Sequence, residues 1–352
     1  TKRYVSKAGS KTVLDKINLE VRDKEFFVLA GPPGAGATTI LRLIAGLETP
    51  DSGEIYIGDQ LVNELEPKDR DVAMVFENLA LYPNKNGFKN IAFPLRQRKV
   101  PDKEITERVM EVARTLKIDH ILDRYPRTYS GGELQRLALA RAMVRRPKVY
   151  LLDQPLANID ARIRANMRAE LKRLVREIGQ TIIYTTHDQL EAISMGDRIG
   201  IINGGVIRQL DTPIALYAKP KDRFVASFIG APRMNFIDCT CEVKDGRTML
   251  VQDSFNLDVT SSQALVGRNA SDSELTLGIR PEDIWLQPNR KSPDCLQGTV
   301  YTLEPMGSRA LLSAQIGKNL VKALIQGGTN LRPGNEVWLE FNKDKIHLFD
   351  RK

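Results

Sequence analysis

One glycine-rich segment constrains the fold of this chain more than any other stretch of its 352 residues. Residues 31–39 read GPPGAGATT, after the apolar run FFVLA and before a helix-like pattern that begins near Thr38. Glycines at this spacing let backbone N–H groups and the start of a helix surround a phosphate. We expect phosphate contacts from Gly31, Pro32, Pro33, Gly34, Ala35, Gly36, Ala37, Thr38 and Thr39. The segment therefore predicts the strand, loop and helix of a nucleotide-binding α/β fold.

Ala37 stands where loops of this layout carry a lysine. That lysine would reach the β- and γ-phosphates, and a charged hydrogen bond of this kind contributes about 1.5–3 kcal/mol, or roughly ten- to a hundredfold in affinity. Thr38 can still offer its hydroxyl to Mg²⁺, and Asp153, at the end of the apolar run VYLLD, can offer a carboxylate to the same ion. We therefore expect the metal ligands Thr38 and Asp153 in a site with a weakened hold on phosphate.

Length and composition fit two water-exposed domains. Hydrophobic residues make up 42% of the chain and charged residues 27%, and no apolar run reaches the ~18 residues needed to cross a bilayer. Cys239 and Cys241 lack the spacing and histidine partners of a zinc site. The net charge is +8, but Lys and Arg are scattered along the chain, so we expect no nucleic-acid partner.

The pattern along the chain changes near residue 230. Before it, short apolar runs alternate with helical patterns at 38–47, 102–116, 133–144 and 161–178, which predicts a parallel sheet covered by helices. After it, short strand-like segments separated by turn residues predict a small all-β domain. Glycine and proline in GAPRMNF, residues 230–236, favour a boundary there. We expect domains at 1–230 and 235–352.

Two further motifs give the chain a family resemblance. YSGGELQRLALARAM, residues 129–143, and VYLLDQPLANID, residues 149–160, follow the glycine loop in the order and spacing of one family. With them, the chain resembles the ATP-binding subunit of an ABC transporter over nearly its whole length. The resemblance implies an α/β P-loop NTPase core with a helical subdomain at about 87–145, plus a C-terminal all-β OB-like domain. It also implies ATP and Mg²⁺ as cofactors.

Three more positions depart from the family's pattern. Gln154 replaces the glutamate that polarises the attacking water, and its amide cannot accept a proton. Glu77, in VFENLALYP, replaces a glutamine that contacts Mg²⁺ and water. Ala8, in SKAGSKTVLDKINL, falls where an aromatic ring stacks on adenine, a contact of about 1–3 kcal/mol by analogy with base stacking, although Tyr4 lies nearby. The resemblance therefore implies a hydrolysis-impaired site.

The elements that face a neighbouring subunit are intact. By resemblance, the signature residues that present a hydroxyl and N–H groups to the γ-phosphate of a partner's ATP are Ser130, Gly131, Gly132 and Glu133, with Asp160 facing the same partner. Glu133 stands in place of the commoner glutamine. His187, in YTTHDQLEA, matches the histidine that holds γ-phosphate and water. The departures from the family's pattern that would impair function are thus confined to the elements that serve the chain's own nucleotide.

This asymmetry favours pairing with a different ATPase subunit, whose site the intact signature would complete. Two alternatives remain open. The chain is a non-hydrolysing regulatory or scaffold subunit, or it is an engineered homodimer that traps ATP, because a glutamate-to-glutamine change at position 154 has that effect. A soluble translation or DNA-repair ATPase of the same class is disfavoured by the single ATPase core and the β domain.

Segments around residues 80–95, FIGAPRMNF and LGIRPEDI resemble the importer branch that takes up oligosaccharides and glycerol phosphates. The resemblance implies two transmembrane permease subunits, an extracytoplasmic solute-binding protein that acts indirectly, and a peripheral place on the cytoplasmic face of the membrane. Residues 77–90 would receive the permease's coupling helix, with Asn84 where a histidine is usual. The solute itself is not encoded in this chain.

Overall fold

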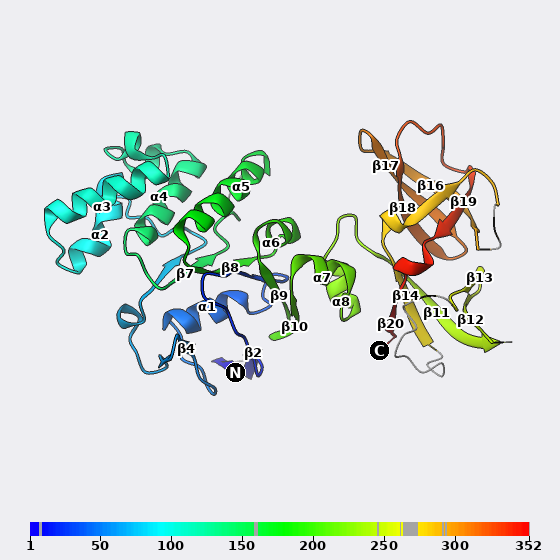
Figure 1. Ribbon diagram of the computed structural model, residues 1–352, viewed down its shortest axis with the longest axis horizontal. Helices are drawn as coiled ribbons and strands as arrows, with labels where there is room; N and C mark the ends of the chain where they lie inside the picture. The colour runs from blue at the N-terminus through cyan, green and yellow to red at the C-terminus, as the bar shows by residue number, and fades with distance from the viewer. Residues whose placement is uncertain are drawn as a thin grey trace. The chain divides into compact units, whose positions relative to one another are not determined.

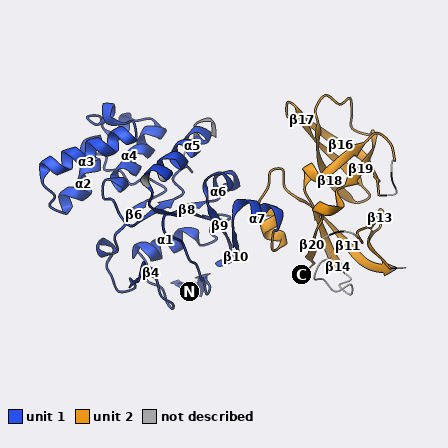
Figure 2. Cartoon of the chain, in the orientation of Figure 1, with its two compact units in different colours: residues 1–219 blue, residues 220–352 orange. Residues whose placement is uncertain are grey.

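The computed structural model describes residues 1–6, 9–157, 161–244, 246–260, 262, 274–290, 292 and 294–351. Two compact units, residues 1–219 and 220–352, make up the chain (Figure 2). The first contains the glycine loop and both later motifs. Over the described ranges, no helix is both long and apolar enough to cross a membrane.

The first unit is an α/β layered structure (Figure 1). Its strands are β1 (Lys2–Ser6), β2 (Gly9–Leu14), β3 (Phe26–Ala30), β4 (Tyr56–Ile57), β5 (Gln60–Leu61), β6 (Val72–Val75), β7 (Val149–Asp153), β8 (Thr181–Thr186), β9 (Arg198–Asn203) and β10 (Val206–Asp211). Its helices are α1 (Ala37–Ala45), α2 (Gly87–Gln97), α3 (Asp102–Thr115), α4 (Gly131–Met143), α5 (Ala161–Ile178), α6 (Gln189–Met195) and α7 (Pro213–Ala218). The predicted P-loop core is confirmed.

The central sheet has the order β10-β9-β3-β8-β7-β6. Neighbouring strands from β9 to β6 run parallel, whereas β10 turns back antiparallel to β9 through Gly204 and Gly205, both at positive φ. All five residues of β3 and all six of β8 are buried, because helices cover both faces of the sheet. The carboxyl ends of β3, β7 and β8 therefore meet at one edge, where the glycine loop begins.

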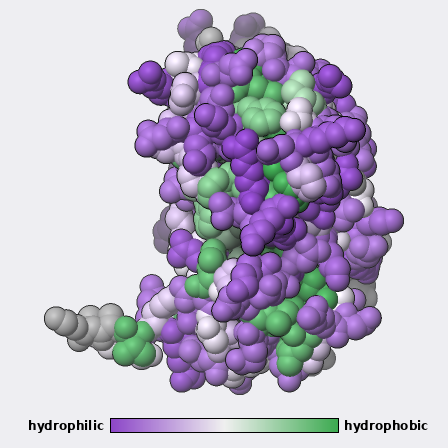
Figure 3. Space-filling view, turned by 90° about the vertical axis from the view of Figure 1, so that its left-hand side faces the viewer, coloured by the Kyte–Doolittle hydropathy of each residue, from purple (hydrophilic) through white to green (hydrophobic). Residues whose placement is uncertain are grey.

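Three helices, α2, α3 and α4, gather beside the sheet as a helical subdomain (Figure 1). In α3 the buried residues Ile105, Val109, Val112 and Ala113 recur at helical spacing and form one apolar stripe. The opposite face of α3 is charged. Seen from the side that carries α2 and α3 in Figure 1, the surface is mostly hydrophilic, with separated hydrophobic patches (Figure 3).

Arg70 joins the end of α1 to the following loop. Its guanidinium is 4% exposed and donates to the carbonyls of Leu43, Ile44, Asn63 and Leu65 at 2.8–3.2 Å. A cation beside the last carbonyls of a helix is favourable, and its loss would leave several buried acceptors without a donor.

We expect Arg70→Ala to lower the free energy of unfolding of the first unit by about 3 kcal/mol. The exposed Arg42, also in the last turn of α1, provides the matched control, and Arg42→Ala should change stability by only about 0.5 kcal/mol. Urea unfolding followed by helical circular dichroism measures both. Equal midpoints for the two variants would contradict the role assigned to Arg70.

The second unit begins with α8 (Arg223–Phe228) and is otherwise built of antiparallel strands. These are β11 (Asn235–Lys244), β12 (Arg247–Gln252), β13 (Phe255–Asp258), β14 (Glu274–Ile279), β15 (Ile284–Gln287), β16 (Leu296–Pro305), β17 (Arg309–Ile316), β18 (Asn319–Gln326), β19 (Glu336–Phe341) and β20 (His347–Asp350). They form two five-stranded sheets, β13-β12-β11-β14-β20 and β15-β19-β16-β17-β18. One apolar core, drawn from both sheets, includes Leu250, Leu277, Leu312 and Leu339. The predicted C-terminal β-rich domain is confirmed.

Candidate functional site

The glycine loop leaves β3 and enters α1 at the carboxyl edge of the sheet. Gly31 donates its N–H to the carbonyl of Thr186, the last residue of β8, at 3.3 Å. A Cβ on Gly31 would lie 2.1 Å from the Ile202 carbonyl oxygen, so only glycine fits there. Gly36 precedes α1 with φ 110°, a conformation that also requires glycine. The loop is thereby fixed with its N–H groups at the start of a helix.

A cavity of about 270 Å³ opens over this loop. Its lining residues are Val13, Gly31, Pro32, Pro33, Gly34, Ala35, Gly36, Ala37, Thr38, Thr39, Gln154, Thr185, Thr186 and His187. The structure therefore brings together all nine predicted loop residues with Gln154 and His187. Among these described lining residues there is no lysine or arginine, and Ala37 begins α1 without a charged side chain.

Asp153 is buried behind the cavity lining and bonds to two of the lining residues. Its side chain is 4% exposed, and its Oδ1 accepts hydrogen bonds from the hydroxyls of Thr38 at 2.8 Å and Thr185 at 2.7 Å. A carboxylate and a hydroxyl held this close are the oxygen ligands that Mg²⁺ uses together with nucleotide phosphates. The donor set of Thr38 and Asp153 thus fits the metal, although Thr38 would have to redirect its hydroxyl proton to bind it.

Thr185 is a site residue that the sequence motifs did not identify. It belongs to the buried strand TIIYTT, whose residues were expected only to build the core. The register of the parallel pair places Thr185 beside Asp153. The sequence did offer one indication: Thr185 carries a hydroxyl at the carboxyl end of a strand, and the neighbouring strand ends in Asp153.

Gln154 lies at the cavity wall in a left-handed backbone conformation, with φ 44°. Its N–H donates to the carbonyl of Thr185 at 3.2 Å and to the Thr185 hydroxyl at 3.1 Å. These bonds fix the turn after β7 and place the position-154 side chain beside the loop. An amide there can donate to or accept from water, but it cannot take a proton from it.

His187 reaches the same cavity from the turn between β8 and α6. A buried network holds the two flanking residues. Thr186 donates its hydroxyl to Glu191, which is 3% exposed, and accepts the Asp188 N–H; Asp188 in turn caps α6. His187 therefore lines the cavity from a turn whose two flanking residues are held by hydrogen bonds.

Apart from Asp153, which is joined to the wall through its bond to Thr38, three residues predicted for this chain's own site or its partner contacts are not assembled into the wall. Glu77 is exposed and lies outside the cavity lining, although it follows β6, the strand that pairs with β7. Ala8 and Asp160 fall outside the described residues. The expected contacts of these three residues with nucleotide, metal or partner stay predictions.

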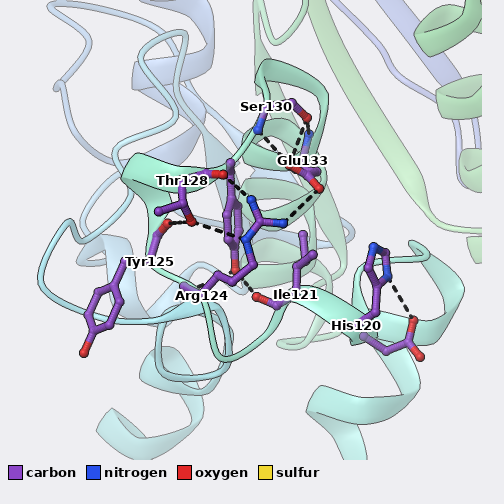
Figure 4. Close-up of polar contacts among 9 residues, drawn as sticks. His120, Ile121, Arg124, Tyr125, Thr128, Ser130 and Glu133 are labelled. Atoms are coloured by element: carbon purple, nitrogen blue, oxygen red, sulfur yellow. Dashed lines mark hydrogen bonds and ion pairs between the residues drawn. The ribbon is translucent and has the colours of Figure 1, made fainter.

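The signature residues lie at the start of α4 (Figure 4). None of them is among the described residues that line the cavity. Ser130 caps the helix: its Oγ accepts from the Glu133 N–H at 3.4 Å, while Glu133 Oε2 accepts from the Ser130 N–H at 2.7 Å and from its hydroxyl at 3.0 Å. This capping box satisfies two N–H groups at the start of α4, those of Ser130 and Glu133. The Ser130 N–H bond also holds the pKa of the Glu133 carboxyl below its usual range.

Arg124 completes the signature turn. Its guanidinium lies 3.5 Å from Glu133 Oε1, donates to both oxygens of Thr128, and sits 5.2 Å from the centre of the Tyr129 ring. A Cβ on Gly131 would meet no described atom within 4 Å, so the front of the turn is open. Helix α4 has 13 residues, and its N-terminus is open with the Ser130 hydroxyl in front of it. Such a helix N-terminus suits an anion supplied by another molecule.

Comparisons with known proteins agree with this geometry. Residues 14–157 match the family described as ABC transporter, residues 230–284 the MalK OB fold domain, and residues 277–349 the TOBE domain. A trehalose/maltose import ATP-binding protein MalK of Thermococcus litoralis is 45% identical over 97% of this chain and 95% of its own length. An sn-glycerol-3-phosphate import ATP-binding protein UgpC of Ruegeria pomeroyi is 41% identical over 97% of this chain and 94% of its own length.

Among solved structures, a dimeric post-hydrolysis state of the ATP-binding cassette MJ0796 bound to ADP and Pi is similar, with a TM-score of 0.55 and 29% identity. The likeness covers 60% of this chain and 95% of that cassette. It therefore corresponds to an ATPase core without the C-terminal β unit.

Proposed function

On the basis that the chain belongs to the ATP-binding subunits of ABC importers of the maltose and glycerol-phosphate type, we propose that it powers uptake of a carbohydrate-type solute. We further propose that it does so as one half of an asymmetric pair of ATPase subunits. Its signature completes the site of a different ATPase subunit, while its own site binds nucleotide weakly and hydrolyses it poorly. The observation that carries this proposal is the contrast between the two surfaces. The cavity over the loop has no cationic side chain among its described lining and carries Gln154, whereas the signature has a complete capping box.

The chemistry of the two half-sites follows from their donors. At the cavity, the loop N–H groups and His187 would bind phosphate, and Thr38 and Asp153 would hold Mg²⁺, which neutralises phosphate charge. Gln154 would orient a water without deprotonating it. At the signature, N–H groups at the start of α4 would meet the γ-phosphate held by the partner's loop, and so would the Ser130 hydroxyl once it turned its proton away from Glu133 Oε2.

The partners proposed with this function are one ATPase subunit of a different sequence, two transmembrane permease subunits and, indirectly, an extracytoplasmic solute-binding protein. The chain would sit peripherally at the cytoplasmic face of the membrane. The relatives named for trehalose/maltose and sn-glycerol-3-phosphate import support a carbohydrate or polyol-phosphate solute.

The composition of the native complex tests the asymmetric pair. The assembly is isolated through a tag on this chain, its mass is measured intact, and each subunit is sequenced by mass spectrometry. One copy beside an ATPase that retains its loop lysine and catalytic glutamate would support the proposal. Two copies of this chain and no other ATPase would overturn it, because both sites would then lack the same groups.

We expect Ser130→Arg to lower ATP hydrolysis by the complex roughly a hundredfold or more, because the arginine side chain would fill the open front of the signature and remove a γ-phosphate donor. Phosphate release at saturating ATP measures the effect. Tyr125→Arg, five residues earlier at a position that is 43% exposed, is the control for an added charge. Full activity of the Ser130 variant would show that the signature serves no hydrolysing site.

A further inference from the structure

A buried hydroxyl connects the signature turn to the helical subdomain. Tyr129, immediately before Ser130, is 8% exposed, and its Oη donates to the carbonyl of Ile121 at 2.6 Å, with the Arg124 carbonyl at 3.3 Å (Figure 4). Burial raises the pKa of this phenol, so it stays a donor at neutral pH. The residue that precedes the phosphate-facing serine is therefore fixed to the 121–124 turn.

The same turn carries the start of α2. The N–H of Gly87 donates to the Arg124 carbonyl and that of Phe88 to the Leu122 carbonyl, both at 2.9 Å. Gly87 is buried, and a Cβ added to it would lie 2.3 Å from the Tyr129 Oη. The first residue of α2 thus packs directly on the tyrosine hydroxyl.

The segment before Gly87 is itself rigid. Asn90, fully buried, exchanges hydrogen bonds with the backbone of Tyr82 and donates to the carbonyls of Lys85 and Asn86, at 2.7–3.1 Å. Asn86 caps α2 by accepting the Lys89 N–H. Residues 82–90 are thus joined by several hydrogen bonds between side chain and backbone, and a Cβ on Gly87 would meet the Tyr129 hydroxyl. Helix α2 also packs on α4, and Arg141 of α4 donates to the carbonyls of Leu79 and Ala80.

We propose that Tyr129 is a positioning residue that fixes the signature to residues 82–90, so that a displacement of that segment moves Ser130 toward or away from the partner's nucleotide. The inference rests on the proposed function, since it requires that Ser130 serve a partner's ATP. The hydroxyl, not the ring, makes the link, because the ring alone would fill the space without joining the three backbone segments.

The test uses the intact complex and two variants, Tyr129→Phe and Gly87→Ala, which alter the two sides of the contact between Gly87 and the Tyr129 hydroxyl. Tyr129→Phe removes the hydroxyl and should lower turnover about threefold to tenfold, the loss expected for one buried hydrogen bond, with the KM for ATP unchanged. The hydrolysis rate is divided by the concentration of sites that bind labelled ATP, so that unfolded protein does not lower the measured turnover. Tyr125→Phe, on the exposed Tyr125 four residues earlier, is the matched control and should behave as the parent.

Gly87→Ala supplies the second arm. It should lower turnover about tenfold in the parent, because its Cβ would lie 2.3 Å from the tyrosine hydroxyl. In the Tyr129→Phe background the further loss should be clearly smaller, because that oxygen is gone and only the contacts of 3.1 Å with the Leu122 Cα and carbonyl oxygen remain. Independent, multiplying effects of the two changes, or a Tyr129→Phe variant equal to Tyr125→Phe, would overturn the inference. If Ser130→Arg abolishes hydrolysis while either of these two results is found, the Tyr129 inference fails and the proposed function stands. If the Ser130→Arg complex stays active, the proposed function fails as well.

Discussion

Replacing Ala37 with lysine is expected to raise the affinity of this chain's own site for ATP by roughly ten- to a hundredfold. Ala37 lines the cavity at the first position of α1, where an ammonium would lie beside the phosphates that the loop N–H groups hold. A charged hydrogen bond of this kind contributes about 1.5–3 kcal/mol, and no described lining residue supplies one at present. Equilibrium dialysis of labelled ATP against the purified chain measures the change.

The control must separate charge from bulk. Ala37→Met adds a side chain of similar reach without a charge and should leave affinity within about threefold of the parent. Chelating Mg²⁺ provides a second comparison, because we expect the parent site, which has no lysine or arginine among its described lining residues, to lose more affinity for ATP on chelation than the lysine variant does. Equal affinities for the lysine and methionine variants would mean that the missing cation does not limit binding.

The sequence predicted the core because its elements are locally encoded. The glycine loop, the buried strands and the helical periodicities predicted helices at 102–116 and 161–178, and the structure has α3 at Asp102–Thr115 and α5 at Ala161–Ile178. It also predicted that the loop, Gln154 and His187 face one ligand, and the cavity brings them together. Each of these features depends on residues close together in sequence, or on motifs whose order fixes their strands.

The sequence did not predict the contacts that depend on register between distant segments. Thr185 bonds to Asp153 across 32 residues, and Arg70 bonds to the end of α1 across 26 and 27. Arg70 lies outside the quoted motifs, and Thr185 lies in YTTHDQLEA without a role assigned to it there. A buried threonine or arginine has no local sequence pattern that identifies its hydrogen-bond acceptor. The Tyr129 hydroxyl was missed for the same reason, because its place before a glycine-rich motif says nothing of the Ile121 carbonyl beneath it.

These contacts also explain how a site can lose its chemistry and keep its shape. Asp153, Thr38 and Thr185 satisfy one another's polar atoms, and the Gln154 backbone is bonded to Thr185, so none of these bonds involves position 37 or the side chain at 154. An alanine at position 37 and a glutamine at position 154 are therefore compatible with these bonds, although neither side chain can supply a cation or a general base. A folded nucleotide site is thus compatible with weak hydrolysis.

Restoring glutamate at position 154 in a chain that also carries Ala37→Lys is expected to raise hydrolysis at this chain's own site by about 10²–10⁴-fold, the usual contribution of a positioned general base. The left-handed turn that carries Gln154 is held by backbone bonds to Thr185, so a glutamate of the same shape should take the same place at the cavity wall. The measurement is phosphate release at saturating ATP, with the partner's site silenced by removing its loop lysine. Gln154→Leu in the same background, which cannot polarise water, should stay at the background rate, and so should Glu77→Gln if position 77 plays no part in proton transfer. If the glutamate variant hydrolyses ATP as slowly as the leucine variant, the side chain at position 154 does not reach the attacking water. Slow hydrolysis at this site would then arise from the geometry of the dimer and not from the absence of a carboxylate.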